Sequence, residues 1–330
     1  MGIKNLNRFL KDNCTKKAIR KIKLENLRGK VIAVDASIYM YRYQTDNALI
    51  EQMYMLLSTL LSNGIIPLFI FDGKPPDDKL ELVRKRRMEK KTAELKYNDI
   101  SNKLENTKDT ITIEAKHELL NELSKLKQQF VRLHGSDILQ VKSLLTAYGV
   151  MYYESYNEAD EVCAYLVKSG KAWGCLSDDM DMFIYNCPYV IRNISLLNGT
   201  VLLYETEQIL KELCMTHHEF KEIMVLSGTD YNINNNSNCN LDNTIELYSK
   251  YRDNRICNKT NEISFYNWLL ETTNYIKDYD ELIHVCNIFN MNSLNTDELD
   301  KLEISTKNID NKLLQNIMVE HGFIFTSMSK

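Results

Sequence analysis

IIPLFIFD at residues 65–72 and KVIAVD at residues 30–35 decide the fold. Both stretches are short and rich in apolar side chains, and each ends in an aspartate, Asp72 and Asp35. Continuous apolar runs of this length are typical of strands that are buried on both faces of a parallel sheet. Each stretch therefore predicts a buried strand that carries a carboxylate at its carboxyl end.

Helical segments are expected on both sides of the second stretch. Helical periodicity runs through residues 37–63 and stops at Asn63-Gly64, and residues 78–133 are charged and helical, with a soft interruption near 98–106. Ser136 is expected to cap a further helix that runs to Tyr148, just before Gly149.

Further strands are predicted at residues 150–153, 172–177 and 189–194, with a helix at 158–169. Strands that alternate with helices predict an α/β fold with a mainly parallel sheet. Residues 232–244 are rich in Asn and are expected to form a loop, and residues 244–330 have the pattern of weakly amphipathic helices.

Acidic residues recur where predicted strands end and predicted helices begin. In parallel sheets, ligands bind beyond the carboxyl ends of the strands, so these acids should converge on one edge. Clustered carboxylates repel one another and raise each other's pKa, and a cation relieves that repulsion. Oxygen-only ligands suit Mg²⁺ or Mn²⁺, and this many acids suggest two ions, the arrangement that serves phosphodiester hydrolysis. The set comprises Asp35, Asp72, Glu158, Asp160, Asp179, Asp181 and Asp230, with Asp178 expected to be a turn residue.

Charge is segregated along the 330-residue chain, whose net charge is −4. Residues 1–30 hold ten Lys and Arg against two acids, and residues 79–134 hold fourteen against nine. Basic stretches of this kind are expected where phosphate groups are held, although solvated helix faces give the same pattern. No apolar run approaches the ~20 residues that a membrane-spanning helix needs.

Six motifs occur along the chain: MGIKNL (1–6), VDASIYMY (34–41), FDGKPP (71–76), NEADE (157–161), SDDMD (177–181) and LSGTDYN (226–232). Their order and spacing, over residues 1–231, resemble the flap endonuclease (XPG-type) family of structure-specific 5′ nucleases. The resemblance implies a PIN-like nuclease fold with a central mainly parallel sheet, a helical arch insertion and a C-terminal helical region.

The resemblance also implies roles for individual residues. Asp35, Asp72, Glu158 and Asp160 would serve one metal, and Asp179, Asp181 and Asp230 the other, with Asp160 standing where relatives usually have Glu. Asp179 and Asp181 are thereby also candidate catalytic residues. Lys79 and Arg86, seven residues apart on one helix face, would contact the scissile phosphate. The run Arg84-Lys85-Arg86-Arg87 leaves Lys85 as an alternative to Arg86, and Arg87 as a further DNA contact. Tyr41 would stack on a base, and Gly2 would let the backbone approach the site.

The same resemblance divides the chain into two parts. Residues 1–231 would form the nuclease core, made of an N-terminal region (1–100) containing the start of a basic arch (about 78–134), and an internal region (135–231). Residues 232–330 would form a divergent helical region. The stretch 232–251, where relatives carry a glycine-rich hairpin that grips duplex DNA, has no glycine. Such a loss weakens or remodels the duplex contact, because glycine lets backbone N–H groups approach phosphate.

The predicted function is Mg²⁺-dependent cleavage of DNA flaps or junctions in replication, repair or recombination, with two ions and Mn²⁺ as a substitute. The alternatives are a 5′→3′ exonuclease on DNA or RNA and a non-catalytic DNA-binding scaffold. The expected partner is DNA with a 5′ single-stranded end or branch, together with replication or repair proteins. We expect an intracellular monomer without membrane attachment, in the nucleus or, for a viral member, at a cytoplasmic replication site.

Overall fold

A seven-stranded sheet lies at the centre of the protein, whose computed structural model describes residues 3–106, 112–232, 239–258, 263–292 and 294–324. Its strand order is β1-β7-β6-β5-β2-β3-β4. Strands β6, β5, β2, β3 and β4 are parallel, whereas β7 pairs antiparallel with both β6 and β1. The strands are β1 (Ile19–Lys23), β2 (Val31–Asp35), β3 (Ile66–Phe71), β4 (Met151–Glu154), β5 (Gly174–Leu176), β6 (Tyr189–Ser195) and β7 (Thr200–Glu205).

Helices cover both faces of the sheet because successive strand residues point to opposite sides. On β3, Leu68 and Ile70 enter one core, and Phe69 and Phe71 enter the other. The first core is closed by α1 (Leu6–Asn13), α7 (Ala159–Lys168), α8 (Thr206–Leu213) and α9 (His217–Ser227), and the second by α2 (Ala36–Thr45), α3 (Leu49–Ser62) and α6 (Gly135–Ala147). The predicted α/β fold with a mainly parallel sheet is confirmed.

Four details of the expected elements were wrong. Strands β1 and β7 were not predicted. The helix expected at 37–63 is broken after Thr45, where Asn47 has a φ of 54°. The helix expected to be capped by Ser136 is instead capped by His134, two residues earlier, because the Asp137 carboxylate accepts the backbone N–H of His134 at 2.8 Å. The interruption expected near 98–106 is absent, since α4 (Leu80–Asn106) is continuous there.

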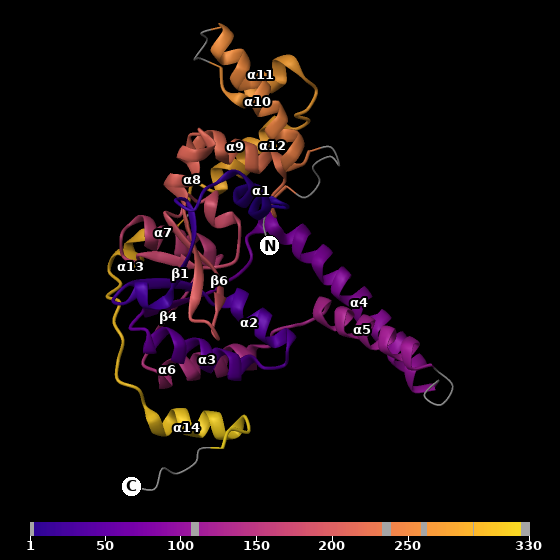
Figure 1. Cartoon of the computed structure of the whole chain (residues 1–330), viewed down its shortest axis with the longest axis vertical. Helices are drawn as coiled ribbons and strands as arrows, with labels where there is room; N and C mark the ends of the chain where they lie inside the picture. Colours follow the sequence, from indigo (N-terminus) through magenta and orange to yellow (C-terminus); the bar gives the residue numbers. More distant parts are fainter. Residues whose placement is uncertain (1–2, 107–111, 233–238, 259–262, 293, 325–330) are drawn as a thin grey trace.

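A long helical hairpin projects from the body of the molecule, formed by α4 and α5 (Ile113–Gln129) (Figure 1). Its two helices pack through an apolar seam that includes Ala93, Leu123 and Leu126. The ring of Tyr97 lies edge-on to Phe130, with the ring centroids 5.3 Å apart. This hairpin occupies the position expected for the basic arch.

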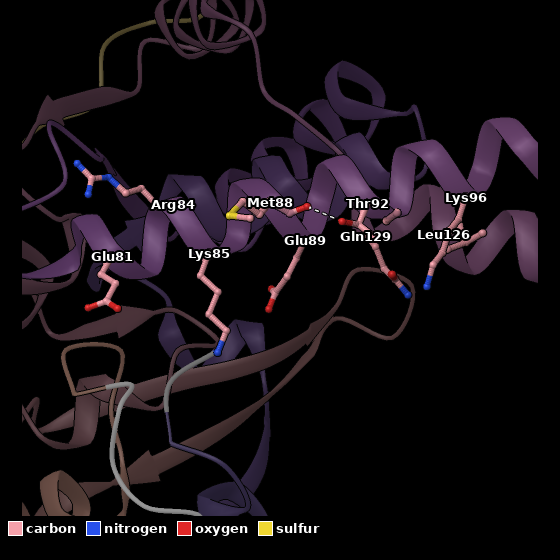
Figure 2. A pocket seen from close by; sticks show the side chains of 10 residues that line it. Glu81, Arg84, Lys85, Met88, Glu89, Thr92, Lys96, Leu126 and Gln129 are labelled. Atoms are coloured by element: carbon pink, nitrogen blue, oxygen red, sulfur yellow. Dashed lines mark hydrogen bonds between the residues drawn. The ribbon is translucent and has the colours of Figure 1, made fainter.

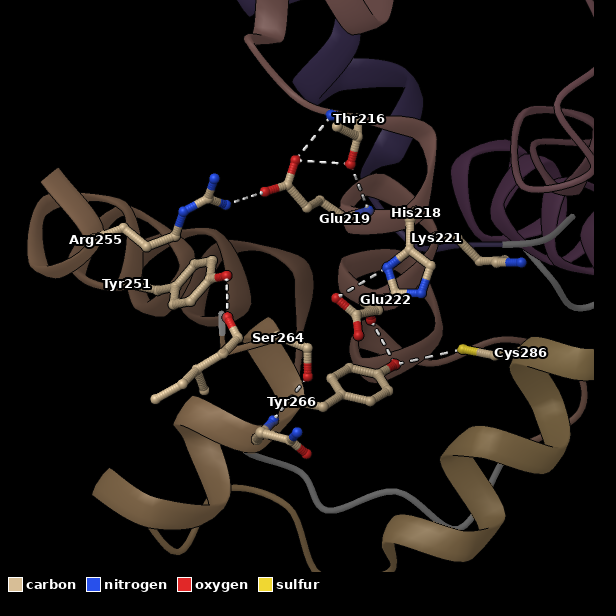
Figure 3. A network of polar contacts seen from close by, with 12 residues as sticks. Thr216, His218, Glu219, Lys221, Glu222, Tyr251, Arg255, Ser264, Tyr266 and Cys286 are labelled. Atoms are coloured by element: carbon tan, nitrogen blue, oxygen red, sulfur yellow. Dashed lines mark hydrogen bonds and ion pairs between the residues drawn. The ribbon is translucent and has the colours of Figure 1, made fainter. Parts of the chain in front are cut away.

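The helices after residue 240 are α10 (Leu241–Asn258), α11 (Phe265–Thr272), α12 (Tyr279–Ile288), α13 (Thr296–Asp300) and α14 (Asn311–Glu320). The first three form a bundle on α9, where polar contacts fix their places (Figure 3). Arg255 of α10 forms an ion pair with Glu219 at 3.0 Å, and the Tyr266 hydroxyl of α11 donates to the Glu222 carbonyl at 2.8 Å. Lys221 donates to the Asn290 side chain at 2.5 Å. None of the helices within the described ranges is long and apolar enough to cross a membrane.

Glu222→Gln is expected to raise the free energy of unfolding by about 1–3 kcal/mol near pH 8 and to leave it almost unchanged near pH 4.5. Burial, and next the charge of Glu219, raise the pKa of Glu222 from 4.5 to about 7. Between those values the folded protein keeps a proton that the unfolded chain has lost, so its stability falls as pH rises through this window. The glutamine side chain does not titrate, so the variant does not lose stability in this window. Denaturant unfolding at several pH values measures the difference in the free energy of unfolding.

Glu219→Gln is the matched control, because the hydrogen bonds from Thr216 lower the pKa of Glu219 against the effect of burial. That substitution should reduce stability near pH 8. A gain from Glu222→Gln of equal size at every pH would show that relieved charge is not its cause.

An extended strap, residues 301–310, crosses from α13 to α14 along the edge of the core. Its Lys307 N–H donates to the carbonyl of Gly149 and its Asp310 N–H to that of Ala147, both at 2.8 Å. Gly149 has a φ of +65°, and a Cβ there would lie 2.4 Å from the Lys307 carbonyl oxygen, so only glycine fits. Beyond the strap, α14 places Met318 in the second core, beside α6.

Candidate active site

The seven predicted acids approach one another at the carboxyl edge of the sheet. Adjacent strands β5, β2, β3 and β4 end there, and the acids follow them directly or lie at the start of α7. Asp230 reaches the same edge from the turn after α9, which Asn232 holds by accepting the backbone N–H of Thr229 at 2.7 Å. Electrostatic coupling links Asp35 to Asp72 and Asp179, Asp160 to Glu158, and Asp181 to Asp230.

A chain of hydrogen bonds orders the acids on β2 and after β5. The Ser177 hydroxyl donates to the Asp35 carboxylate at 3.0 Å and accepts the backbone N–H of Asp179 at 3.1 Å. The Asp179 carboxylate then accepts the backbone N–H of Asp181 at 3.0 Å. Across the edge, the Asp72 carboxylate accepts the N–H of Ala159 at 2.8 Å, at the start of α7. These bonds fix the carboxylate directions before any ligand arrives.

The electrostatics of this edge suit a bound cation. Burial, and next Asp72 and Asp179, raise the pKa of Asp35 to about 8. Burial followed by Asp179 also raises the pKa of Asp160 and of Asp181 well above the usual range. One oxygen of Asp160 and one of Asp181 are buried without a hydrogen-bond partner in the described residues. Buried carboxylate oxygens without donors carry a large desolvation cost, and a hard cation is the partner that would remove it.

Lys79 lies at the foot of the arch and points into the acids. It is 7% exposed, and its ammonium contacts both Glu158 oxygens at 2.7 Å. The same nitrogen lies 4.2 Å from the ring centroid of Tyr231, whose hydroxyl donates to Glu158 at 2.5 Å. Although burial opposes the charge, Tyr231, Glu158 and Asp181 raise the pKa of Lys79 above its ordinary value, so it stays a cation.

Arg86, two turns along α4, forms an ion pair with Asp230 at 2.8 Å. Lys85 instead lines a cavity of about 610 Å³ at the base of the arch, beside Met88 and Glu89 (Figure 2), and Arg87 is exposed. Arg86 rather than Lys85 therefore reaches the carboxylates.

Within the described ranges, no group of three or more His, Cys, Asp or Glu side chains is already arranged to hold a metal ion.

Tyr41 of α2 lies at the mouth of the site. It is 41% exposed, whereas Tyr39 and Tyr43 are packed in the core. Burial, and next Asp72, raise the pKa of Tyr41, with Arg86 opposing them, which shows that both groups are near. The Lys90 ammonium lies 4.9 Å from its ring centroid. An exposed ring beside two cations suits base stacking next to phosphate contacts.

Tyr41→Ala is expected to weaken binding of 5′-flap DNA by ~1–3 kcal/mol, which is roughly 5–150-fold in Kd, through the loss of base stacking. Tyr41→Phe keeps the ring and should bind within about twofold of the wild type. Fluorescence anisotropy with Ca²⁺, which permits binding without cleavage, measures both variants. Equal losses in the two would assign the effect to the hydroxyl and contradict stacking.

Gly2 lies outside the described residues. Asp178 is a structural residue, as expected: it pairs with Arg42 and accepts the Asn193 N–H at 2.8 Å. Ser177 and Tyr231 were missed, and the only sequence signal for them was their adjacency to acids within the SDDMD and LSGTDYN motifs.

Comparison with known proteins gives consistent matches. Residues 1–93 match the XPG N-terminal domain and residues 149–230 match the XPG I-region. Flap endonuclease 1 from Glycine max is 33% identical over 250 residues, which cover 70% of this chain and 62% of that protein. The chain spans 52–66% of the length of the other curated flap endonucleases compared with it.

Two solved structures share the fold over nearly the whole chain. The catalytic core of Rad2 in complex with DNA substrate aligns with a TM-score of 0.66 at 23% identity, covering 97% of this chain and 94% of that one. Flap endonuclease-1 from Methanococcus jannaschii aligns with a TM-score of 0.60 at 21% identity, covering 92% and 90%.

A mainly parallel sheet with an acid-lined carboxyl edge and an inserted helical hairpin places the chain in the class of PIN-like folds that these two structures share. The two matched domains and the curated relatives narrow this class. The chain belongs to the XPG-type flap endonuclease family.

Proposed function

We propose that this protein is a structure-specific 5′ nuclease that cuts DNA at flaps or junctions during replication, repair or recombination. The observation that carries the proposal is the meeting of seven carboxylates with Lys79 and Arg86, two cations from the arch, at one edge of the sheet. A site built for a small phosphorylated metabolite would have no use for a basic hairpin that projects beyond it. The nuclease core is residues 1–231, and residues 232–330 form the helical region.

The proposed metal ligands are the seven acids, with Asp35, Asp72, Glu158 and Asp160 on one side and Asp179, Asp181 and Asp230 on the other. Mg²⁺ is the proposed ion, with Mn²⁺ as a substitute, because every donor is a carboxylate oxygen. Two such cations, when bound, lower the pKa of water and offset charge on the reacting phosphate. The buried oxygens of Asp160 and Asp181, which meet no donor among the described residues, support this assignment.

The protein's own groups orient the substrate and stabilise charge. A water oxygen bonds to phosphorus as the P–O3′ bond breaks, which leaves a 5′-phosphate and, after protonation, a 3′-hydroxyl. Lys79 and Arg86 donate to the non-bridging oxygens, where negative charge grows. For this they must turn from Glu158 and Asp230 toward the phosphate. Tyr41 stacks on the base next to the cut, and Ser177 keeps the Asp35 and Asp179 carboxylates aligned.

The test compares cleavage of labelled 5′ flap, nicked duplex, blunt duplex and single-stranded DNA with Mg²⁺, using Asp179→Ala as the control. Cutting at the flap base that disappears in the variant supports the proposal, and shows that flap recognition does not need the missing glycines. Stepwise cutting from 5′ ends would favour the exonuclease. Intact DNA binding without any cleavage, in Mg²⁺ or Mn²⁺, would exclude catalysis and favour a non-catalytic DNA-binding scaffold.

A further inference from the structure

Phe289 of the C-terminal helical bundle packs against two tyrosines beside the active site, Tyr231 and Tyr185. Phe289 caps α12 and is 2% exposed. Its ring meets Tyr231 edge-on, with centroids 5.4 Å apart and planes at 86°. It also meets Tyr185 edge-on, with centroids 4.9 Å apart. Edge-to-face pairs of this kind hold both rings in defined orientations.

Both partners of Phe289 belong to acid-bearing segments. Tyr231 directly follows Asp230, and Tyr185 donates its backbone N–H to the Asp181 carbonyl at 3.1 Å. The Tyr231 hydroxyl holds Glu158 at 2.5 Å, and its ring lies 4.2 Å from the Lys79 ammonium. The orientation of one ring, Tyr231, therefore sets both a proposed metal ligand and a proposed phosphate contact.

Tyr231 also borders open space on the side that faces α12. A cavity of about 310 Å³ lies between α12 and the site, and its lining includes Glu158, Tyr185, Tyr231 and Ile288. Loss of the Phe289 ring would leave a second void against Tyr231, which would then have room to tilt away from Glu158 and Lys79. Phe289 is thus the packing contact that prevents this motion.

Polar contacts fix the helical bundle on α9, so the position of Phe289 is fixed as well. Next to Phe289, the Asn290 side chain accepts from Lys221 of α9 at 2.5 Å. Tyr266 contacts the Cys286 sulfur at 3.7 Å while donating to the Glu222 carbonyl (Figure 3). At its other side, α12 meets the foot of the arch, where His284 lies 3.0 Å from Asp78, the neighbour of Lys79.

We infer that Phe289 is a positioning residue for the proposed cleavage reaction: through the Tyr231 ring, the C-terminal bundle sets the places of Lys79 and Glu158. This inference rests on the proposed nuclease function. It gives residues 239–292 a role at the chemical step, although they lie outside both matched XPG domains.

The test uses the full-length protein with Phe289→Leu, the ring-retaining Phe289→Tyr and the matched control Phe265→Leu. Phe265 is fully buried in the same bundle against Tyr248 and Tyr251. We expect Phe289→Leu to lower the single-turnover rate on flap DNA by ~10–100-fold and to weaken Mn²⁺ binding, measured by calorimetry without DNA, several-fold. Flap affinity in Ca²⁺ should fall much less than the rate, because only the Lys79 contact at the cut site is disturbed and the other proposed DNA contacts, such as Tyr41 and Arg86, are kept.

Phe289→Tyr should keep the rate within about threefold of the wild type, and Phe265→Leu should do the same even where its melting temperature falls further. A Phe289→Leu/Tyr231→Phe double variant should be little worse than the poorer single variant, because both act on one contact. Equal rates and Mn²⁺ affinities for wild type and Phe289→Leu would overturn the inference, as would equal losses in Phe265→Leu. A wild-type protein that cuts no substrate would instead overturn the proposed function. The Mn²⁺ affinity of Phe289→Leu would still test the positioning role of Phe289 in that case, because it is measured without cleavage.

Discussion

Asp181→Asn is expected to lower the rate of flap cleavage by ~10³-fold or more and to leave the metal-free protein at least as stable as the wild type. Asp181 is 3% exposed, and one of its carboxylate oxygens contacts no donor in the described part of the chain. Burial and then Asp179 oppose its charge. The asparagine side chain therefore removes charge repulsion from the metal-free protein and removes a metal ligand from the metal-bound protein. The stability of the metal-free protein should therefore hold or rise while the cleavage rate falls.

Two experiments check this expectation. Single-turnover cleavage with Mg²⁺ gives the rate, and thermal unfolding with EDTA and then with Mg²⁺ gives the stabilisation by metal, which should shrink in the variant. Asp178→Asn is the matched control from the same turn: it loses the ion pair with Arg42, while its amide oxygen can still accept the Asn193 N–H, so it should lose some stability and keep most activity. If Asp181→Asn cleaves normally, or if it is clearly destabilised in EDTA, Asp181 is a structural residue.

Arg86→Ala is expected to reduce the cleavage rate by ~10²–10³-fold, whereas Lys85→Ala should reduce it only a few-fold. Arg86 extends from the arch to Asp230 at 2.8 Å, so its guanidinium already lies at the edge where the phosphate must sit. Lys85, one residue away on α4, lines the arch cavity (Figure 2). The pair separates the electrostatic stabilisation of the reacting phosphate from the general attraction of a basic helix for DNA.

The Mn²⁺ affinity of the Arg86→Ala variant is a second measurement whose direction of change can be predicted. Removal of Arg86 frees Asp230 from its partner, so Mn²⁺ should bind the variant at least as tightly as the wild type in the absence of DNA. The rates of both variants are measured with enzyme in excess over flap DNA, and Kd in Ca²⁺ is measured beside them. Comparable rate losses for Lys85→Ala and Arg86→Ala would mean that the arch contributes only net charge.

The sequence predicted the central strands well and the edge strands poorly. Strands such as β3 are buried on both faces, so their apolar runs stand out from the surrounding chain. Strand β1, IRKIK, lies at the edge of the sheet and alternates half-buried with exposed residues, and its basic side chains suggested a phosphate-binding stretch instead. The turn after Thr45 was missed because the apolar periodicity continues across it and only Asn47 adopts the left-handed backbone.

The acids of the site could be predicted because strand topology brings them together. Once a strand is assigned, parallel pairing fixes which end of it meets the ligand, and Asp35, Asp72 and Asp179 follow. The contributions of Ser177, Tyr231 and Phe289 could not be predicted in this way. Each depends on a side-chain direction or on a helix from a distant part of the chain, and neither periodicity nor spacing encodes those.

The strap that crosses Gly149 leads to α14, so the second core cannot be fully packed until this late part of the chain has been synthesised. Helices α3 and α6 leave the ribosome more than a hundred residues before α14, yet Met318 of α14 is fully buried in the core they share. Until then that apolar surface faces water, and it is open to contact with chaperones or with other nascent chains. This core of the N-terminal half therefore stays incomplete until residue 318 has been synthesised.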